Sequence, residues 1–195
     1  MLNENFVILA ALINLLGAAS YIKNTIKGKV KPNRVSWGLW TAAAMIAFLA
    51  ELAQGVGILS LATFMVGFGP LLIFLASFVN KKSYWKISTF DKWCGALSVV
   101  GLVLWYITKV GNIAIAFSIF ADLMAGIPTL VKSYKYPETE NWIAYMFSII
   151  SISIALLTIK TWTFPSYGFP LYILIFDSTA FLLIKFKLGK RIKTA

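Results

Sequence analysis

Two segments of this chain resemble each other, and this internal duplication constrains the fold more than any other feature of the sequence. The segments span residues 17–40 and 126–145. Each segment starts with a glycine at the end of an apolar run and has a lysine six residues later. A charged loop follows and leads into the pattern Pro-x-x-x-x-Trp, with an aromatic residue three positions after the tryptophan. Between the lysine and the proline, the loop of the first segment is four residues longer than that of the second. The duplication predicts a fold built from two copies of one unit.

The chain is too apolar for a soluble domain of its length. Hydrophobic residues make up 59% of the 195 positions and charged residues only 13%. Seven apolar runs are each long enough to cross about 30 Å of hydrocarbon as a helix. The sequence therefore predicts an all-α integral membrane protein, a single membrane domain over residues 1–195 with seven transmembrane helices. The predicted helices are 5–22, 35–52, 57–79, 92–108, 112–131, 142–159 and 166–186.

The basic residues predict the orientation in the membrane. Of the 18 Lys and Arg residues, only Lys109 and Lys160 lie in the second, fourth and sixth loops, and the others lie in or beside the odd-numbered loops and the C-terminal tail. By the positive-inside rule, the N-terminus is outside and the basic tail, residues 187–195, is cytoplasmic. The net charge of +11 is explained by this pattern, so we expect a lipid bilayer and no nucleic acid as partner.

The duplication divides the predicted helices into three groups. Residues 5–79 form a first three-helix repeat, residues 112–186 form a second, and the helix 92–108 connects them. A single connecting helix restores the direction of the second triplet, so the two repeats are predicted to be parallel. The connector has no ionisable residue in its middle and is expected to face lipid.

This 3+1+3 layout resembles the SWEET/PQ-loop transporter superfamily. The best local match is Gly-Ile-Pro-Thr-Leu-Val-Lys-Ser-Tyr-Lys at 126–135, where Pro128 matches the proline of the PQ-loop pattern and Thr129 replaces its glutamine. In the first repeat, Ala19 and Ser20 stand in place of the proline and the glutamine. Residues 31–40 more closely resemble an uncharacterised group of small bacterial membrane proteins with the same layout. The resemblance implies a bacterial inner-membrane location and alternating-access transport of a small solute, and it supplies no substrate. The intramembrane aspartates described next favour either proton coupling or a polar or cationic solute.

Four residues of the odd-numbered helices are predicted at a common depth near the midplane: Asn14, Gly69, Asp122 and Asp177. Ionisable groups at membrane depth are costly and usually functional. No lysine or arginine is predicted at this depth. Either at least one aspartate is therefore protonated in the empty site, or a cationic solute or ion completes it.

A structural role is the alternative for these polar residues. A protonated aspartate can bond a neighbouring helix, for example through Ser148, Ser151 or Ser153, and an asparagine such as Asn14 commonly joins helices in the same way.

Aromatic residues form a second candidate group. Trp37 and Trp40 lie one turn apart, and Trp142 and Tyr145 repeat this spacing. Tryptophan at the start of a membrane helix is typically an interfacial anchor, and we interpret Trp37 and Trp142 in this way. Trp40 and Tyr145 are one turn deeper and could instead stack on a solute.

Prolines inside the predicted helices are candidates for hinges or gates. Pro128 lies six residues after Asp122 and removes a backbone hydrogen bond from its helix. Gly69 and Pro70 interrupt the third helix at the predicted midplane. A static bend is the alternative to a hinge.

The motifs of the common enzyme classes are missing. The sequence contains no histidine, no Gly-x-Ser-x-Gly and no cluster with metal-ligand spacing, so we expect no enzyme, no catalytic residue, no metal site and no cofactor. We predict a small-solute transporter whose substrate site is formed by Asp122, Asp177, Asn14, Trp40 and Tyr145. The alternative is a ligand-binding receptor or retention protein on the same fold, without transport. The expected partner is a small polar solute, and a homo-oligomer is compatible with these features.

Overall fold

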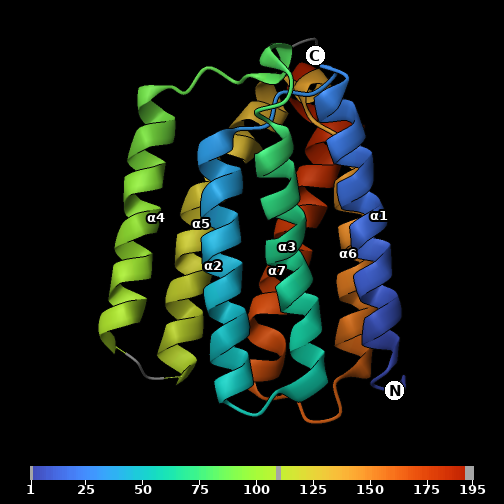
Figure 1. Cartoon of the computed structure of the whole chain (residues 1–195), viewed down its shortest axis with the longest axis vertical. Coiled ribbons are helices and arrows are strands. Elements are labelled where there is room, and N and C mark those ends of the chain that lie inside the picture. Colours follow the sequence, from blue (N-terminus) through green and yellow to red (C-terminus); the bar gives the residue numbers. More distant parts are fainter. Residues whose placement is uncertain (1, 109–110, 192–195) are drawn as a thin grey trace.

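The computed structural model describes residues 2–108 and 111–191, which form a bundle of helices with no strand among them (Figure 1). Three short 3₁₀ helices accompany the α-helices: η1 (Gly57–Leu59), η2 (Lys81–Ser83) and η3 (Pro137–Thr139). The α-helices are α1 (Phe6–Ile26), α2 (Arg34–Ala53), α3 (Ser60–Ala76), α4 (Thr89–Thr108), α5 (Gly111–Lys135), α6 (Trp142–Thr158), α7 (Phe164–Lys185) and α8 (Leu188–Arg191).

Each predicted apolar run is helical. Within the described residues, six helical segments are long and apolar enough to cross a membrane, η1 being counted together with α3. The helix α6 is equally apolar but has only 17 residues. The predicted all-helical fold is thus confirmed, and it is compatible with a multi-pass membrane protein; of the seven predicted spans, six have helices of sufficient length and α6 is shorter. The predicted basic tail contributes the short helix α8, whereas residues 192–195 and Lys109 lie outside the described residues.

Side-chain caps define where three helices begin. The Asn33 side chain accepts a hydrogen bond from the Val35 amide (3.1 Å), and the Asn141 side chain accepts one from the Ile143 amide (2.9 Å). At the start of α4, Asp91 accepts hydrogen bonds from the Ser88 amide (2.6 Å) and from Asn33 Nδ2 (2.9 Å). The last contact fixes the start of the connector against the start of α2.

The loops after α1 and α5 are nearly equal in length, so the predicted four-residue difference is wrong. They span residues 27–33 and 136–141. The prediction aligned two prolines that have different local roles. Pro32 directly precedes the cap residue Asn33, whereas Pro137 starts η3, several residues before the cap residue Asn141. The cap residues Asn33 and Asn141 are 108 residues apart. Aligning the two halves on these caps gives a different register from aligning them on the prolines.

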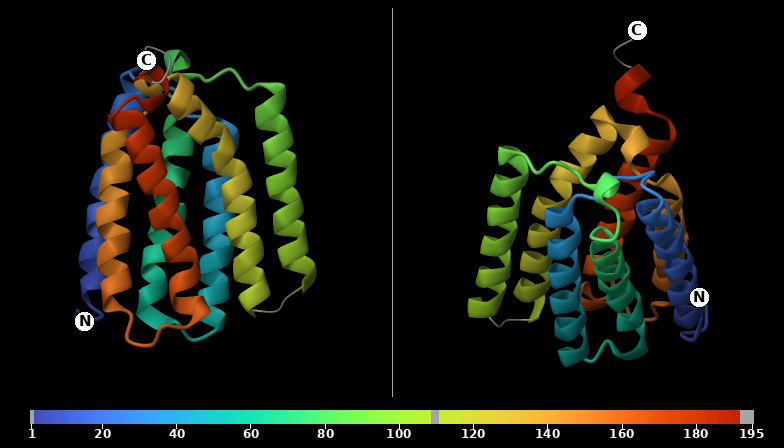
Figure 2. Two further views of the ribbon diagram at one scale, coloured as in Figure 1. Left: turned by 180° about the vertical axis from the view of Figure 1, so that it is seen from behind. Right: turned by 45° about the horizontal axis from the view of Figure 1, so that its top comes forward.

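The helices alternate in direction, so that α1, α3, α5 and α7 run one way and α2, α4 and α6 the other (Figures 1 and 2). In the first half, α3 packs against both α1 and α2, and in the second half α7 packs against both α5 and α6. The halves are joined crosswise, α1 to α6 and α2 to α5. The loops 27–33, 77–88 and 136–141 gather at one end of the bundle, uppermost in Figure 1, which we call the lysine-rich end.

The connector α4 lies at the edge of the bundle and packs on α5 and α2 (Figure 1). Two glycines allow its close approach, because a Cβ at Gly95 would lie 2.9 Å from Val35 and one at Gly101 would lie 3.0 Å from Ala121. Its other face carries exposed apolar side chains, such as Trp93 and Ile107. Such a surface is expected of a helix that faces lipid.

Cysteine labelling tests the predicted orientation. In a variant without Cys94, single cysteines at Lys29 and Lys82 should be protected from a membrane-impermeant maleimide in intact cells, because both exposed positions lie at the lysine-rich end. A cysteine at the exposed Thr161, between α6 and α7, should react. All three should react after lysis. Labelling of Lys29→Cys in intact cells would contradict the orientation.

Candidate functional site

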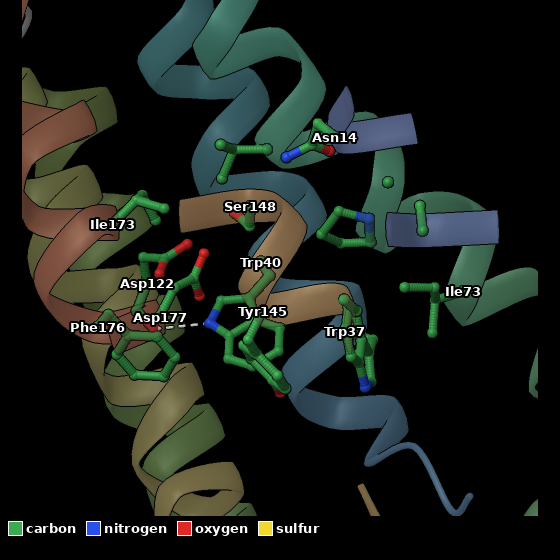
Figure 3. Close-up of a pocket in the computed structure, with 15 residues that line it drawn as sticks. Asn14, Trp37, Trp40, Ile73, Asp122, Tyr145, Ser148, Ile173, Phe176 and Asp177 are labelled. Atoms are coloured by element: carbon green, nitrogen blue, oxygen red, sulfur yellow. Dashed lines mark hydrogen bonds between the residues drawn. The ribbon is translucent and has the colours of Figure 1, made fainter. Parts of the chain in front are cut away.

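A cavity of about 70 Å³ lies between the two halves (Figure 3). Three of its polar residues, Asn14, Asp122 and Asp177, lie near the middle of their helices. Its walls come from α1, α2, α3, α5, α6 and α7, and no described residue of α4 contributes. The cavity brings together seven of the eight residues that the sequence singled out: Asn14, Trp40, Gly69, Pro70, Asp122, Tyr145 and Asp177.

Pro128 is the exception. It is buried inside α5, between Asp122 and the end of the helix, and it does not line the cavity. The helix continues past this proline to Lys135. Pro70 likewise lies within an unbroken helix, α3, but at the cavity wall.

Asp122 is held by two contacts and keeps one oxygen free of partners. The Tyr172 hydroxyl donates to Asp122 Oδ2 (2.8 Å), and Trp40 Nε1 donates to the backbone carbonyl of Asp122 (3.1 Å). The side chain is 1% exposed, and its Oδ1 has no hydrogen-bond partner. An unpaired buried carboxylate oxygen is costly, which sets this group apart from an ordinary core residue.

Asp177, on α7, lies beside Asp122, and both carboxyl groups point into the cavity (Figure 3). Ser148 of α6 also lines the cavity. No lysine or arginine is among the residues that line the cavity. The hydrogen bond from Tyr172 of α7 to Asp122 of α5 is an interhelical bond of the kind that a purely structural role requires, but it supplies no counter-charge.

A series of aromatic rings packs along the side of the cavity toward the lysine-rich end. The Trp37 ring lies 4.7 Å from the Tyr21 ring and 5.0 Å from the Trp40 ring, and Trp40 lies 5.6 Å from Phe176. Tyr145 lies beside Trp40 (Figure 3). These rings separate the two carboxyl groups from the loops at the lysine-rich end.

The interpretation of Trp37 as an interfacial anchor is wrong. Trp37 is 5% exposed and lines the cavity, because Tyr21 and Trp40 pack against it and its position on α2 faces the bundle interior. Trp142 is only partly buried, and it packs against Phe181 with Lys185 Nζ 3.5 Å from its ring centroid. This environment fits the anchor interpretation.

Four pairs of cavity residues are separated by the same distance in sequence. The members of each pair are 108 residues apart, as are the helix caps Asn33 and Asn141. The pairs are Asn14 with Asp122, Trp37 with Tyr145, Trp40 with Ser148, and Gly69 with Asp177. This spacing is the signal by which Ser148 and Trp37 could have been found from the sequence, had the helix caps been used for the alignment. Tyr172 and Phe176 belong to no such pair, so this spacing could not have identified them from the sequence.

A buried ion pair lies at the lysine-rich end. Lys132 Nζ is 2.6 Å from Glu140 Oε1, and the two side chains are 1% and 0% exposed. The Tyr21 hydroxyl donates to Glu140 Oε2 (2.7 Å). Lys132 also donates to the Lys31 carbonyl and lies 4.8 Å from the centroid of the Trp85 ring. The sequence analysis missed this cluster, because hydropathy places Lys132 at a helix end and gives no sign of its burial.

The cluster joins the two halves of the bundle. Tyr21 belongs to α1, whereas Lys132 and Glu140 belong to α5 and the loop that follows it. Two further contacts cross the same boundary: the Lys31 amide donates to the Thr139 carbonyl (3.0 Å), and Asn141 Nδ2 donates to Ser20 Oγ (3.1 Å). The cavity is therefore closed toward this end by aromatic rings and then by a layer of polar contacts between the halves.

Comparison with protein families, with curated proteins and with solved structures finds no match for this chain. Among the described residues, no three His, Cys, Asp or Glu side chains are grouped so as to hold a metal ion. The site is thus known from its own geometry alone.

Gly126 allows two of the rings to pack at the cavity wall. A Cβ at this position would lie 2.5 Å from the Phe176 ring and 3.2 Å from Trp40. We expect Gly126→Ala to lower the free energy of unfolding by about 1–3 kcal/mol, because the rings must shift. Gly38→Ala in α2 is the control, since its Cβ would meet Phe74 only at 3.5 Å. Thermal unfolding in detergent measures both variants, and equal stability of the two would contradict the predicted overpacking.

The two neighbouring ion pairs should differ greatly in their contribution to stability. Glu140→Gln leaves Lys132 buried without its counter-charge and should cost about 3–5 kcal/mol. Glu138→Gln is the control: the hydrogen bond from Lys190 lowers the pKa of the Glu138 carboxyl, but both side chains are about half exposed, so its loss should cost about 0–1 kcal/mol. Denaturant unfolding compares the variants. A smaller loss for Glu140→Gln than for Glu138→Gln would show that the buried pair does not stabilise the fold.

Proposed function

We propose that this protein is a small-solute membrane transporter and that its substrate binds in the cavity between the two halves. One observation carries the proposal. Six helices, three from each half, line a cavity into which two aspartates point, while no described residue of the connector lines it. Buried ionisable groups that face a cavity inside a membrane bundle are typical of solute and ion pathways.

The proposal includes two parallel repeats, residues 5–79 and 112–186, related by an axis along the membrane normal and joined by the connector 92–108. Two features support it. The crosswise contacts are reciprocal, because exchanging the halves turns the contact of α1 with α6 into that of α5 with α2. The cavity residues and the helix caps also share the spacing of 108 residues. A substrate site on the boundary between such repeats is typical of transporters.

Transport would require the lysine-rich end to open, which we take to be the cytoplasmic end. The two halves would rock against each other, so that the aromatic rings and the polar layer beyond them separate. The contacts that must break are those between the halves, in particular Tyr21 with Glu140 and Ser20 with Asn141. The Lys132–Glu140 pair lies within the second half and can move with it once the hydrogen bond from Lys132 to the Lys31 carbonyl of the first half is broken.

A reversible crosslink between the halves tests this mechanism. Ser20→Cys with Asn141→Cys, in a variant without Cys94, places two thiols where Oγ and Nδ2 lie 3.1 Å apart. A thermal-shift screen of sugars, amino acids, nucleosides and cationic vitamins first selects the strongest stabilising solute. Oxidation of the double variant in proteoliposomes should then reduce uptake of that solute to background, and reduction should restore it.

A crosslink within one half is the control. Glu138→Cys with Lys190→Cys, joined by a short bifunctional thiol reagent that spans the length of the original side chains, links two exposed residues of the second half at the same end of the bundle, and uptake should survive this crosslink. Full uptake after complete crosslinking of Ser20→Cys and Asn141→Cys would contradict the rocking mechanism. A solute that stabilises the protein but is never taken up would instead identify it as a receptor or retention protein.

A further inference from the structure

We propose that the substrate is a compact organic cation, an amine of a few heavy atoms, whose ammonium group lies between Asp122 and Asp177 and whose apolar part packs against the aromatic wall. This inference rests on the proposed function, because it takes the cavity to be a solute site. It adds the charge, the size and the binding mode of the solute.

The charge of the cavity is the first argument. Two carboxyl groups point into it from α5 and α7, and no lysine or arginine lines it. Burying ionised carboxylates without a partner is very costly, so the cavity as a whole disfavours an anion and favours a ligand that brings a positive charge. At the lysine-rich end, by contrast, the buried Glu140 already has Lys132 as its counter-ion.

The hydrogen-bonding groups around the carboxylates are the second argument. The Tyr172 hydroxyl donates to Asp122 Oδ2, and Trp40 Nε1 donates to the backbone carbonyl of Asp122. Asp122 Oδ1 remains buried without a partner. Two further lining groups, Trp37 Nε1 and the Tyr145 hydroxyl, are also buried without a partner and belong to the aromatic wall. Next to the two carboxyl groups, the site offers a ligand acceptor oxygens, and an ammonium group, which only donates, matches them.

The aromatic wall is the third argument. Trp40, Tyr145 and Phe176 lie next to the two carboxyl groups (Figure 3). Aromatic faces attract ammonium groups and also accommodate the hydrocarbon part of an amine. A bare metal cation would instead require several oxygen ligands around it, and most of the wall is apolar or aromatic.

The size of the cavity limits the ligand. Its volume of about 70 Å³ corresponds to roughly five waters, at about 10–15 Å³ of such volume for each. A small alkylamine fits this space in the present conformation, whereas a hexose does not.

Selective stabilisation of the wild-type protein is the first test. Thermal unfolding of the full chain in detergent is measured with ethylammonium chloride, with ethanol as a neutral molecule of similar shape, with glucose, and with sodium or potassium chloride at equal ionic strength. We expect ethylammonium alone to raise the melting temperature in a saturable way. Equal effects of ethylammonium and ethanol, of ethylammonium and the inorganic salts, or stabilisation by glucose alone would overturn the proposal. This test needs no variant and so does not depend on whether a variant folds.

Isosteric variants test the binding mode. Asp122→Asn and Asp177→Asn keep the shape of the side chain and remove the charge, so each should weaken ethylammonium binding at least ten-fold. The control Glu138→Gln removes an exposed carboxylate outside the cavity and should leave the affinity unchanged. Wild-type affinity in both aspartate variants would overturn the placement of the ammonium group.

Uptake of labelled ethylammonium separates this inference from the proposed function. Uptake by the wild-type protein that is lost in the Asp122→Asn variant supports both. Selective binding without uptake keeps the cation as the ligand and contradicts transport. Uptake of a sugar without binding of ethylammonium keeps transport and overturns the cation.

Discussion

The central constraint on this structure is the cost of placing two carboxyl groups, Asp122 and Asp177, inside an apolar helix bundle. The bundle stabilises them only in part: the Tyr172 hydroxyl donates to Asp122, and Ser148 lines the cavity that both aspartates face. Neither group brings a positive charge, and one oxygen of Asp122 has no partner. A core that had only to be stable would gain by replacing such groups with apolar ones of similar volume. The persistence of the pair at a cavity between the halves is therefore better explained by a ligand than by packing.

The buried charges at the lysine-rich end show that this bundle can neutralise a carboxylate when stability is what matters. Glu140 is as deeply buried as Asp122, yet it has the Lys132 ammonium at 2.6 Å and the Tyr21 hydroxyl at 2.7 Å. Lys132 in turn donates to the Lys31 carbonyl. This network is closed within the protein, and it joins loops of the two halves. The two sites therefore differ in chemistry. At the end of the bundle, the carboxylate has a lysine as counter-ion, whereas the two carboxyl groups at its centre have none.

The sequence predicted the elements whose signal is carried by hydropathy and missed those that depend on packing. The apolar runs identified the helices, and the rarity of charge within them identified Asp122 and Asp177. The direction in which Trp37 points was not predictable, because a tryptophan near a helix start can face lipid or the interior with the same hydropathy. The burial of Lys132 depends on Glu140 and Tyr21, which are distant in sequence and meet only in the fold. The alignment of the two halves failed at their prolines, because one precedes a cap and the other starts a 3₁₀ turn.

The paired positions around the cavity are chemically unequal, and the inequality has a mechanistic consequence. Where the second half has Asp122 and Asp177, the first has Asn14 and Gly69, and where the first has Trp40, the second has Ser148. Both charged groups therefore belong to the second half, and the large indole rings belong to α2 of the first. If the halves rock, a cation held by the carboxyl groups moves with α5 and α7, while the indole wall moves with the first half. The aromatic contacts are then the ones made and broken during each cycle. They are weaker than the contact with the carboxyl pair, so the barrier to rocking can stay low while the ligand stays bound.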